Sequence, residues 1–300
     1  MIDPGKTEAR LRAHVEMLTR TIGERSVYRL DNLSKSAEYV EEFYHRINIV
    51  SKKEIYDYIT GPVANISAKI TFSPNPSRTF LIGAHYDSVS GTVGADDNAS
   101  AVAVLLETAR QMAMAKEKKN LDLSVEFVCF ALEEPPAYGS RYMGSRVYAK
   151  NARKLKKKID GMICLEMVGY TCHVPGCQSY PFPLMFRNYP KTGNFIGIVG
   201  NFKSRKFNHS LCHAFEQNPK LPVIGLTIPL NGYLMPNVRL SDHASFWDQG
   251  YEAVMVTDTA FYRNPYYHTP SDTMETLDFA FMAQLVNSLC LSLECLGKVP

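Results

Sequence analysis

Short apolar segments alternate with helical segments along almost the whole chain, and this alternation most restricts the possible fold. The apolar segments, such as "LIGA" and "VCFAL", carry few polar residues. Strands of this kind are typical of parallel sheets that helices cover on both faces. The sequence therefore predicts an α/β fold, a three-layer α/β/α sandwich around a mostly parallel, mixed sheet.

The spacing of apolar residues and the Gly- and Pro-rich turns locate the individual elements. Predicted strands occupy residues 65–72, 78–88, 123–134, 160–170, 195–201, 222–230 and 252–260. Predicted helices occupy residues 7–22, 36–48, 98–115, 140–155, 204–217, 242–249 and 278–296. Because no repeat or linker interrupts the pattern, we expect a single domain over residues 1–300, with residues 1–60 as an N-terminal helical segment packed on it.

Composition excludes several classes of partner. The 33 basic and 30 acidic residues give a formal net charge of +3. The sequence contains no strongly basic stripe, so a nucleic-acid partner is not expected. No apolar stretch is expected to span a bilayer, and the N-terminus "MIDPGKTEARLRAHVEML" lacks the apolar core of an export signal. We expect a soluble protein without a membrane partner, cytoplasmic as the chain stands, or exported if a signal peptide has been removed. Its oligomeric state stays open.

The seven cysteines are odd in number, and most lie in apolar segments, which favours buried free thiols. Cys172 and Cys177 differ, because they bracket the turn "CHVPGC". They would form a disulfide in an oxidising compartment, and the sequence leaves both redox states open.

Acids and histidines gather where the predicted strands end. Carboxyl ends of strands in an open α/β sheet line the crevice in which ligands bind, so these side chains are expected to converge. The polar residues at strand ends or at the start of the following helix are His85, Asp87, Asp96, Asp97, Glu133, Glu134, Glu166 and His268.

Each of these residues also has an ordinary explanation. Asp96 and Asp97 would serve as helix N-caps, and Glu133 and Glu134 as a solvated strand end. Taken together, however, several converging carboxylates cannot all stay ionised without a cation. Two histidines with several carboxylates suit zinc, with other divalent metals as alternatives, and two ions that share a carboxylate form a hydrolytic site.

Six stretches occur in an order that resembles the zinc-dependent aminopeptidases of the M28 type, a family that also includes glutaminyl cyclases and glutamate carboxypeptidases. They are "GAHYDS", "GADDNAS", "ALEE", "LEMVGY", "SDHASF" and "YYHTPSDT", between residues 83 and 273. The resemblance implies a zinc-exopeptidase fold with two Zn²⁺ ions. It places His85 and Glu166 on one ion, Glu134 and His268 on the other, and Asp97 between the two. It also implies a cis peptide bond after Asp97.

The resemblance assigns further roles near these ligands. Asp87 would orient His85, since ligating histidines usually have such a partner. Glu133 would be the general base that takes a proton from the metal-bridging water and hands it to the leaving amine. Tyr267 would hydrogen-bond the oxyanion. Asp242 and His243 stay outside the metal ligands.

The leading functional hypothesis is a metallo-aminopeptidase that cleaves the N-terminal residue from peptides with a free N-terminus. An apolar or aromatic first residue is expected, with ordinary packing as the alternative role of the bulky residues near the predicted pocket. Those residues are Tyr170, Phe182, Met185, Phe186, Phe261, Tyr262 and Tyr266.

Three alternatives stay open. A glutaminyl cyclase would use a single zinc ion, whereas His85 together with "YYHTPSDT" favours two ions and hydrolysis. A dipeptidyl or carboxypeptidase variant would need an arginine aimed at a substrate carboxylate, for which Arg187, Arg239 and Arg263 are candidates. A binding protein without activity should lack ligands, which this chain has.

Overall fold

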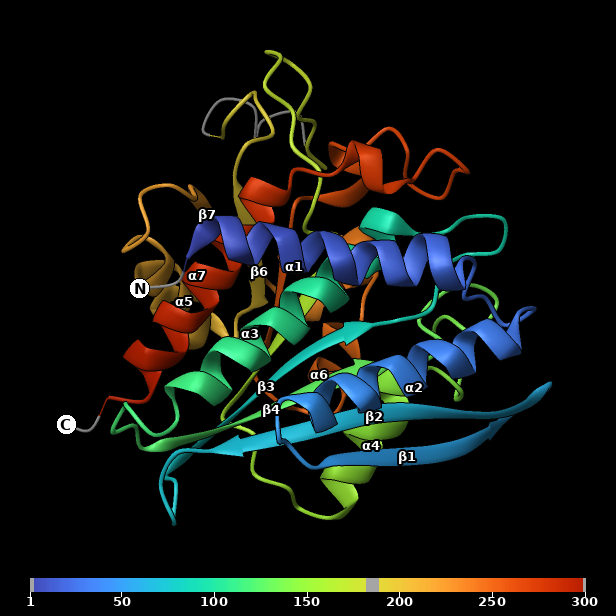
Figure 1. Cartoon of the computed structure of the whole chain (residues 1–300). Helices are drawn as coiled ribbons and strands as arrows, with labels where there is room; N and C mark the ends of the chain where they lie inside the picture. The colour runs from blue at the N-terminus through green and yellow to red at the C-terminus, as the bar shows by residue number, and fades with distance from the viewer. Residues whose placement is uncertain (1–2, 182–188, 299–300) are drawn as a thin grey trace.

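The computed structural model describes residues 3–181 and 189–298, and it shows one continuous eight-stranded sheet with helices on both faces (Figure 1). The strand order is β1-β2-β4-β3-β5-β8-β6-β7. The β3–β4, β3–β5, β5–β8 and β6–β7 pairs are parallel, and the other three pairs are antiparallel. The predicted mixed α/β/α sandwich is therefore confirmed.

The strands of the sheet are β1 (Ser51–Tyr58), β2 (Gly61–Thr71), β3 (Arg78–His85), β4 (Leu123–Phe130), β5 (Gly161–Glu166), β6 (Ile196–Asn201), β7 (Val223–Ile228) and β8 (Ala253–Thr257). The α-helices are α1 (Pro4–Glu16), α2 (Leu30–Arg46), α3 (Ala101–Ala115), α4 (Gly144–Lys154), α5 (Arg205–Phe215), α6 (His243–Asp248) and α7 (Phe279–Leu296). Short π or 3₁₀ turns are η1 (Met17–Ile22), η2 (Ala95–Ser100), η4 (Leu230–Gly232), η5 (Pro236–Arg239), η6 (Ala260–Tyr262) and η7 (Met274–Thr276).

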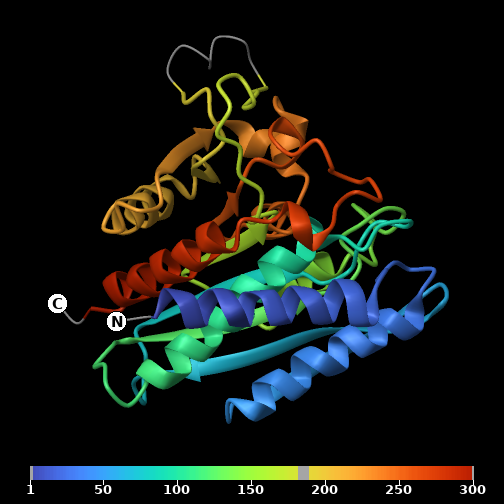
Figure 2. The same cartoon turned by 45° about the horizontal axis from the view of Figure 1, so that its top comes forward.

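Alternating side chains of the central strands build two separate cores. In β4, Phe127 and Cys129 pack in the larger core with α1, α2, α3 and α7, whereas Val128 and Phe130 pack in the smaller core with α4 and α6. This alternation follows from the two-residue period of a strand. Figure 2 shows α1 running beside α7 over the larger core.

Two details of the sequence analysis need correction. No element was predicted for Ser51–Tyr58, but this segment is the edge strand β1, so the N-terminal segment is not wholly helical. By length and composition alone, helix α7 is long and apolar enough to span a membrane. The prediction that no apolar stretch of the chain could span a bilayer was therefore wrong. In the structure 67% of this helix is buried, against α1, α3 and α5, as in the core helix of a globular protein.

Candidate metal centre

The predicted site residues come together where the parallel strands end. His85 and Glu166 are the last residues of β3 and β5, and Glu133 and Glu134 follow the end of β4. Left-handed backbone conformations occur beside them, with φ of 57° at Leu132 and 45° at Met167. Non-glycine residues rarely adopt this conformation, and it turns the chain out of the sheet where the acids begin. The strands are therefore shorter than predicted.

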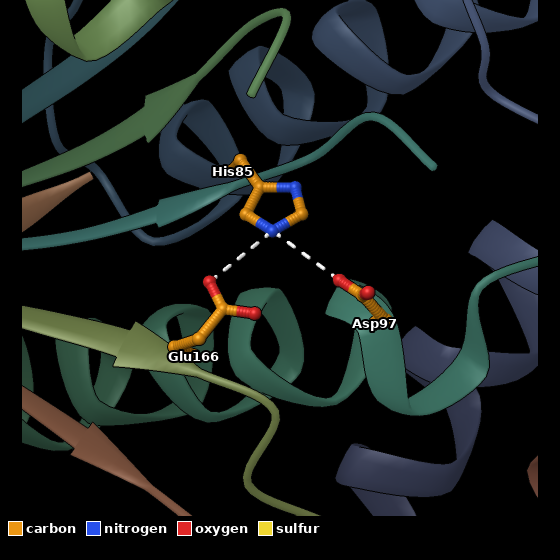
Figure 3. Close-up of side chains that lie close together, drawn as sticks. All are labelled: His85, Asp97 and Glu166. Atoms are coloured by element: carbon orange, nitrogen blue, oxygen red, sulfur yellow. Dashed lines mark ion pairs between the residues drawn. The ribbon is translucent and has the colours of Figure 1, made fainter. Parts of the chain in front are cut away.

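Three buried side chains from three elements form a first group of candidate metal ligands, called the first ligand group below. Nε2 of His85 lies 3.4 Å from Oδ1 of Asp97 and 3.4 Å from Oε2 of Glu166. Figure 3 shows the three side chains pointing toward one another from β3, η2 and β5. Two ligand atoms that each lie about 2.1 Å from one tetrahedral zinc ion are about 3.4 Å apart, so the spacing fits zinc.

A second ligand group shares Asp97 with the first. Nε2 of His268 lies 3.1 Å from Oδ2 of Asp97 and 3.2 Å from Oε2 of Glu134. Asp97 therefore offers one carboxylate oxygen to each group. Within each group, the candidate ligand atoms all lie within 4.8 Å of one another.

Several atoms of these groups are buried and lack a hydrogen-bond partner. Among the described residues they include both ring nitrogens of His85, Oδ1 of Asp97, Oε1 of Glu134 and Nε2 of His268. Burying a polar atom without a partner costs roughly 1–3 kcal/mol, and native proteins rarely tolerate it. Bound cations would satisfy the atoms that face the two groups, whereas Nδ1 of His85 faces Asp87 instead. The residues therefore fit a metal.

The electrostatics of the cluster also favour a cation. Burial and the charge of Asp97 raise the pKa of Glu134 to about 8, and burial raises the pKa of Glu133 well above its usual range. Burial acts to lower the pKa of His268, but the neighbouring carboxylates of Asp97 and Glu134 outweigh burial and raise that pKa to about 10. Without a metal, the cluster therefore retains protons that a divalent cation would displace.

Asp87 connects the ends of β3 and β4. Its Oδ1 lies 3.3 Å from Nδ1 of His85, which is the contact expected from the sequence. Its two carboxylate oxygens also accept hydrogen bonds of 3.0 Å from the backbone amides of Glu133 and Glu134. Asp87 thus contacts the ring of His85 and the backbone of both Glu133 and Glu134 at once. The Asp97–Asn98 peptide bond is cis, as expected.

Three residues that contact the site or the loop before it were not assigned a role from the sequence. Ser241 donates to Glu166, Asp272 accepts from the amides of Asp96 and Asp97, and Arg25 donates to the carbonyls of Val93 and Gly94. Ser241 and Asp272 lie inside the recognised motifs "SDHASF" and "YYHTPSDT", which was the available signal, whereas a single sequence contains no signal for Arg25. Asp242 and His243 lie outside both ligand groups, and Nε2 of His243 donates to the carbonyl of Val238.

A pocket of about 100 Å³ opens beside the first ligand group. Glu166 and Tyr267 lie in its wall, and apolar side chains of β6, β7 and β8 such as Val199, Leu226 and Met255 form much of the remainder. Of the bulky residues expected there, Phe261 and Tyr262 line the pocket, whereas Tyr170 and Tyr266 pack against each other. Phe182, Met185 and Phe186 lie outside the described residues.

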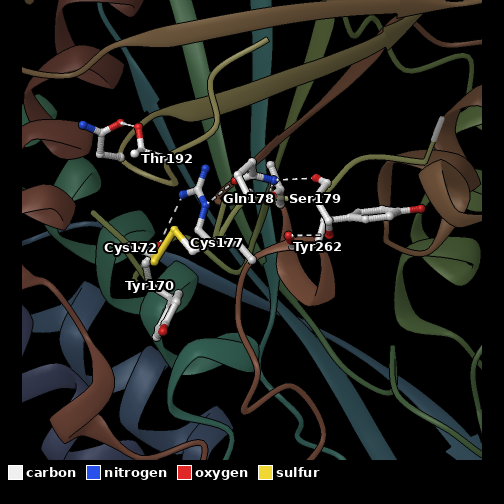
Figure 4. Close-up of a disulfide and its surroundings, with 10 residues drawn as sticks. Tyr170, Cys172, Cys177, Gln178, Ser179, Thr192 and Tyr262 are labelled. Atoms are coloured by element: carbon white, nitrogen blue, oxygen red, sulfur yellow. Dashed lines mark hydrogen bonds between the residues drawn. A yellow bond between two sulfur atoms is a disulfide. The ribbon is translucent and has the colours of Figure 1, made fainter. Parts of the chain in front are cut away.

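A disulfide closes the loop beside this pocket. Cys172 and Cys177 are bonded, with their Cα atoms 6.4 Å apart (Figure 4). The next residue, Gln178, donates to Oγ1 of Thr259 over 2.9 Å and accepts from Nε of Arg263 over 2.8 Å. The loop is thereby tied to the segment that follows β8.

The candidate arginines for a substrate carboxylate are engaged elsewhere. Besides Gln178, the buried Arg263 donates to the carbonyls of Tyr170 and Phe195. Arg239 donates to the carbonyl of Asn231 and to Asp248. Arg187 lies outside the described residues.

The two candidate ligand groups fit a metal-dependent hydrolase, and the family of the chain supports this class. The model of peptidase family M28 matches residues 65–291, and the chain belongs to this family. It is 38% identical to the Escherichia coli (strain K12) protein YfbL, over 92% of this chain and 84% of that protein. YfbL is described as an uncharacterized protein.

Two fungal relatives have informative names. A probable zinc metalloprotease of Pyrenophora tritici-repentis is 25% identical over 82% of this chain and 56% of that protein. A probable leucine aminopeptidase of Arthroderma otae is 27% identical over 73% of this chain and 53% of that protein. The chain thus spans little more than half the length of these relatives. The family and these names support a zinc-dependent peptidase.

Solved structures share the fold. The LapA aminopeptidase of Legionella pneumophila aligns with a TM-score of 0.73 and 18% identity, over 97% of this chain and 72% of LapA. A glutaminyl cyclase of Porphyromonas gingivalis aligns with a TM-score of 0.67 and 16% identity, over 97% of both chains. At these identities the likeness concerns the fold alone.

Proposed function

We propose that the protein is a dinuclear zinc aminopeptidase, with one domain over the whole chain. The observation that carries the proposal is the position of Asp97 between the two ligand groups. One of its carboxylate oxygens lies in the group of His85 and Glu166, and the other lies in the group of Glu134 and His268. A shared carboxylate between two ligand groups is the arrangement of two-metal hydrolases. When bound, zinc lowers the pKa of a water molecule and polarises the carbonyl under attack.

Glu133 is the proposed general base. Its Oε2 lies 3.9 Å from Nε2 of His85, so the carboxylate lies beside the first ligand group. The side chain is buried beside the ligand groups, where a carboxylate freed of its proton by the bound metal could act as a base. In the proposed reaction it takes a proton from the attacking water and gives it to the amine that leaves.

Tyr267 is the proposed donor to the oxyanion. Its ring stacks on His268 with ring centroids 3.8 Å apart, and it lies in the wall of the pocket. Burial, followed by the charge of Asp97, raises the pKa of Tyr267, so the phenol remains a donor at neutral pH. The apolar pocket would take the first side chain of a peptide, and the neighbouring carboxylates its free amine.

The proposal is tested by counting metal ions and products together. We expect two zinc ions per chain and release of the reporter from aminoacyl substrates, which a chelator abolishes and zinc restores. Glu133→Gln should lower turnover by a factor of about 10²–10⁴ and still bind metal. The matched control is Glu126→Gln, because Glu126 is a buried acid of β4 that bonds Tyr148 and Lys157. This control should retain turnover.

A glutaminyl cyclase is the second candidate, because its fold aligns over the whole chain. Cyclisation of an N-terminal glutamine peptide with one zinc ion per chain, and no reporter release, would establish that activity instead. A protein that binds no zinc would contradict both.

A further inference from the structure

Three successive backbone amides before the bridging carboxylate all donate to one residue. The amide of Asp96 donates to Oδ1 of Asp272 over 2.8 Å, and the amide of Asp97 donates to Oδ2 over 3.1 Å. The amide of Ala95 donates to the backbone carbonyl of Asp272 over 3.3 Å. Asp272 is 1% exposed, so these bonds lie in the protein interior.

Asp272 also belongs to the segment that carries the second histidine. Its own amide donates to the carbonyl of Thr269, the residue after His268. The carboxylate therefore joins the backbone of Asp97 to the backbone of the His268 segment. These two residues supply the Oδ2 and Nε2 atoms that lie 3.1 Å apart in the second ligand group.

The carboxylate of Asp272 is buried close to two other acids, since it accepts from the backbone amides of Asp96 and Asp97. A single hydrogen bond would not require an acid at this position. The amides of Asp96 and Asp97, however, each donate to a different oxygen of the side chain, so two acceptor oxygens are required. A carboxylate offers both, whereas an asparagine side chain offers one oxygen and presents a donor at the other position. Asp87 similarly accepts from two successive amides, those of Glu133 and Glu134, and this parallel supports a positional role for Asp272.

We propose that Asp272 is a positioning residue, which fixes Asp97 relative to His268 and thereby sets the metal affinity of the second ligand group. The proposal rests on the proposed metal centre. It assigns to Asp272 no contact with substrate or metal.

The test compares metal binding by the wild type, Asp272→Asn and Asp278→Asn. Asp278 is the matched control, because its carboxylate accepts from the amide of Phe281 and from the hydroxyl of Thr171, away from the ligands. Zinc affinity is measured by competition with a chromophoric chelator, and geometry by the visible absorption of the cobalt-loaded protein. Losing an outer partner of a ligand typically costs 10–100-fold in metal affinity, so we expect about that loss for Asp272→Asn and little for Asp278→Asn.

The outcomes separate this inference from the proposed function. Equal zinc affinity and an unchanged cobalt spectrum in Asp272→Asn would overturn the inference alone. An equal loss in both variants would do the same, because it would indicate general destabilisation. A wild type that binds no metal would overturn the metal centre as well. If Asp272→Asn does not fold, Asp272→Glu keeps both acceptor oxygens but moves them by one methylene. That variant should also bind zinc more weakly with an altered cobalt spectrum, and wild-type behaviour would refute the inference.

Discussion

Oγ of Ser241 donates a hydrogen bond of 2.6 Å to Oε2 of Glu166. The same carboxylate oxygen lies 3.4 Å from Nε2 of His85, so the hydroxyl acts on the oxygen that would meet a metal. Because a hydroxyl has a single hydrogen, the thiol of Cys164, 3.1 Å away, donates to Ser241 in turn. A buried chain of donors therefore fixes the side chain of Glu166.

Ser241→Ala should weaken zinc binding at the first ligand group by about 10–100-fold, because Glu166 loses the partner that orients it. Stepwise zinc titration measures this, and the group with His268 should change less. Ser245→Ala is the matched control, since it removes a buried hydroxyl that pairs with Ser145 over 2.9 Å. Equal affinity in Ser241→Ala and the wild type would show that packing alone holds Glu166.

Arg25→Met should lower the free energy of unfolding by at least about 3 kcal/mol, as measured by urea denaturation without metal. The guanidinium of Arg25 is fully buried, and its loss leaves several carbonyl groups without a donor. Those carbonyls belong to Leu18, Gly23, Tyr86, Val93 and Gly94. Arg29→Met, at an exposed position nearby, should change stability by no more than about 0.5 kcal/mol.

Leu226→Trp should reduce activity toward large first residues by at least about tenfold in kcat/KM, with a smaller effect on an alanine substrate. Leu226 lies in the pocket wall, and a larger ring there takes up space that a substrate side chain would fill. Thr227→Trp is the control, because neighbouring residues of β7 face opposite sides of the sheet. An unchanged preference in Leu226→Trp would place the substrate side chain elsewhere.

We expect the free energy of unfolding to fall in mild acid because His14 is buried in its neutral form. Burial, followed by the charges of Arg46, Arg110 and Arg10, lowers the pKa of His14 to about 3, and its Nδ1 lies 2.6 Å from the hydroxyl of Tyr39. The unfolded chain therefore binds a proton below about pH 6.5 that the folded protein does not bind, and stability falls as the pH falls. The loss reaches at most about 1.4 kcal/mol for each pH unit.

Urea denaturation of the wild type and His14→Asn at several pH values tests this sign. The variant should be less stable near neutral pH, and the gap should narrow as the pH falls through the range from about 6 to 4. The other titrating groups contribute equally to the free energies of unfolding of the two proteins, so their contributions cancel when one free energy is subtracted from the other. A gap that stays constant with pH would mean that His14 has the same pKa in the folded and the unfolded protein.

The sequence by itself determined the fold class and the residues gathered at the strand ends. Alternating apolar strands and helices are a local pattern, and burial on both faces follows from the lack of polar residues in the strands. The acids at or just after the ends of β3, β4 and β5 were readable from the sequence because they come at the end of apolar runs. The edge strand β1 was missed because Lys52, Lys53, Glu54 and Asp57 give it a polar surface, and only pairing with β2 makes it a strand.

Only the tertiary structure decided which side chains meet. The sheet order places β3 between β4 and β5, and this brings His85, Glu134 and Glu166 to one edge, although the three lie far apart in the chain. The bonds from Ser241 to Glu166 and from the amide of Asp97 to Asp272 join segments that no local pattern relates. Arg25 reaches its carbonyl partners only because the N-terminal turn packs beside the loop after β3. The spacing of apolar residues along the sequence indicates which face of a helix or strand is buried. The distances within a metal centre depend instead on how these elements pack together.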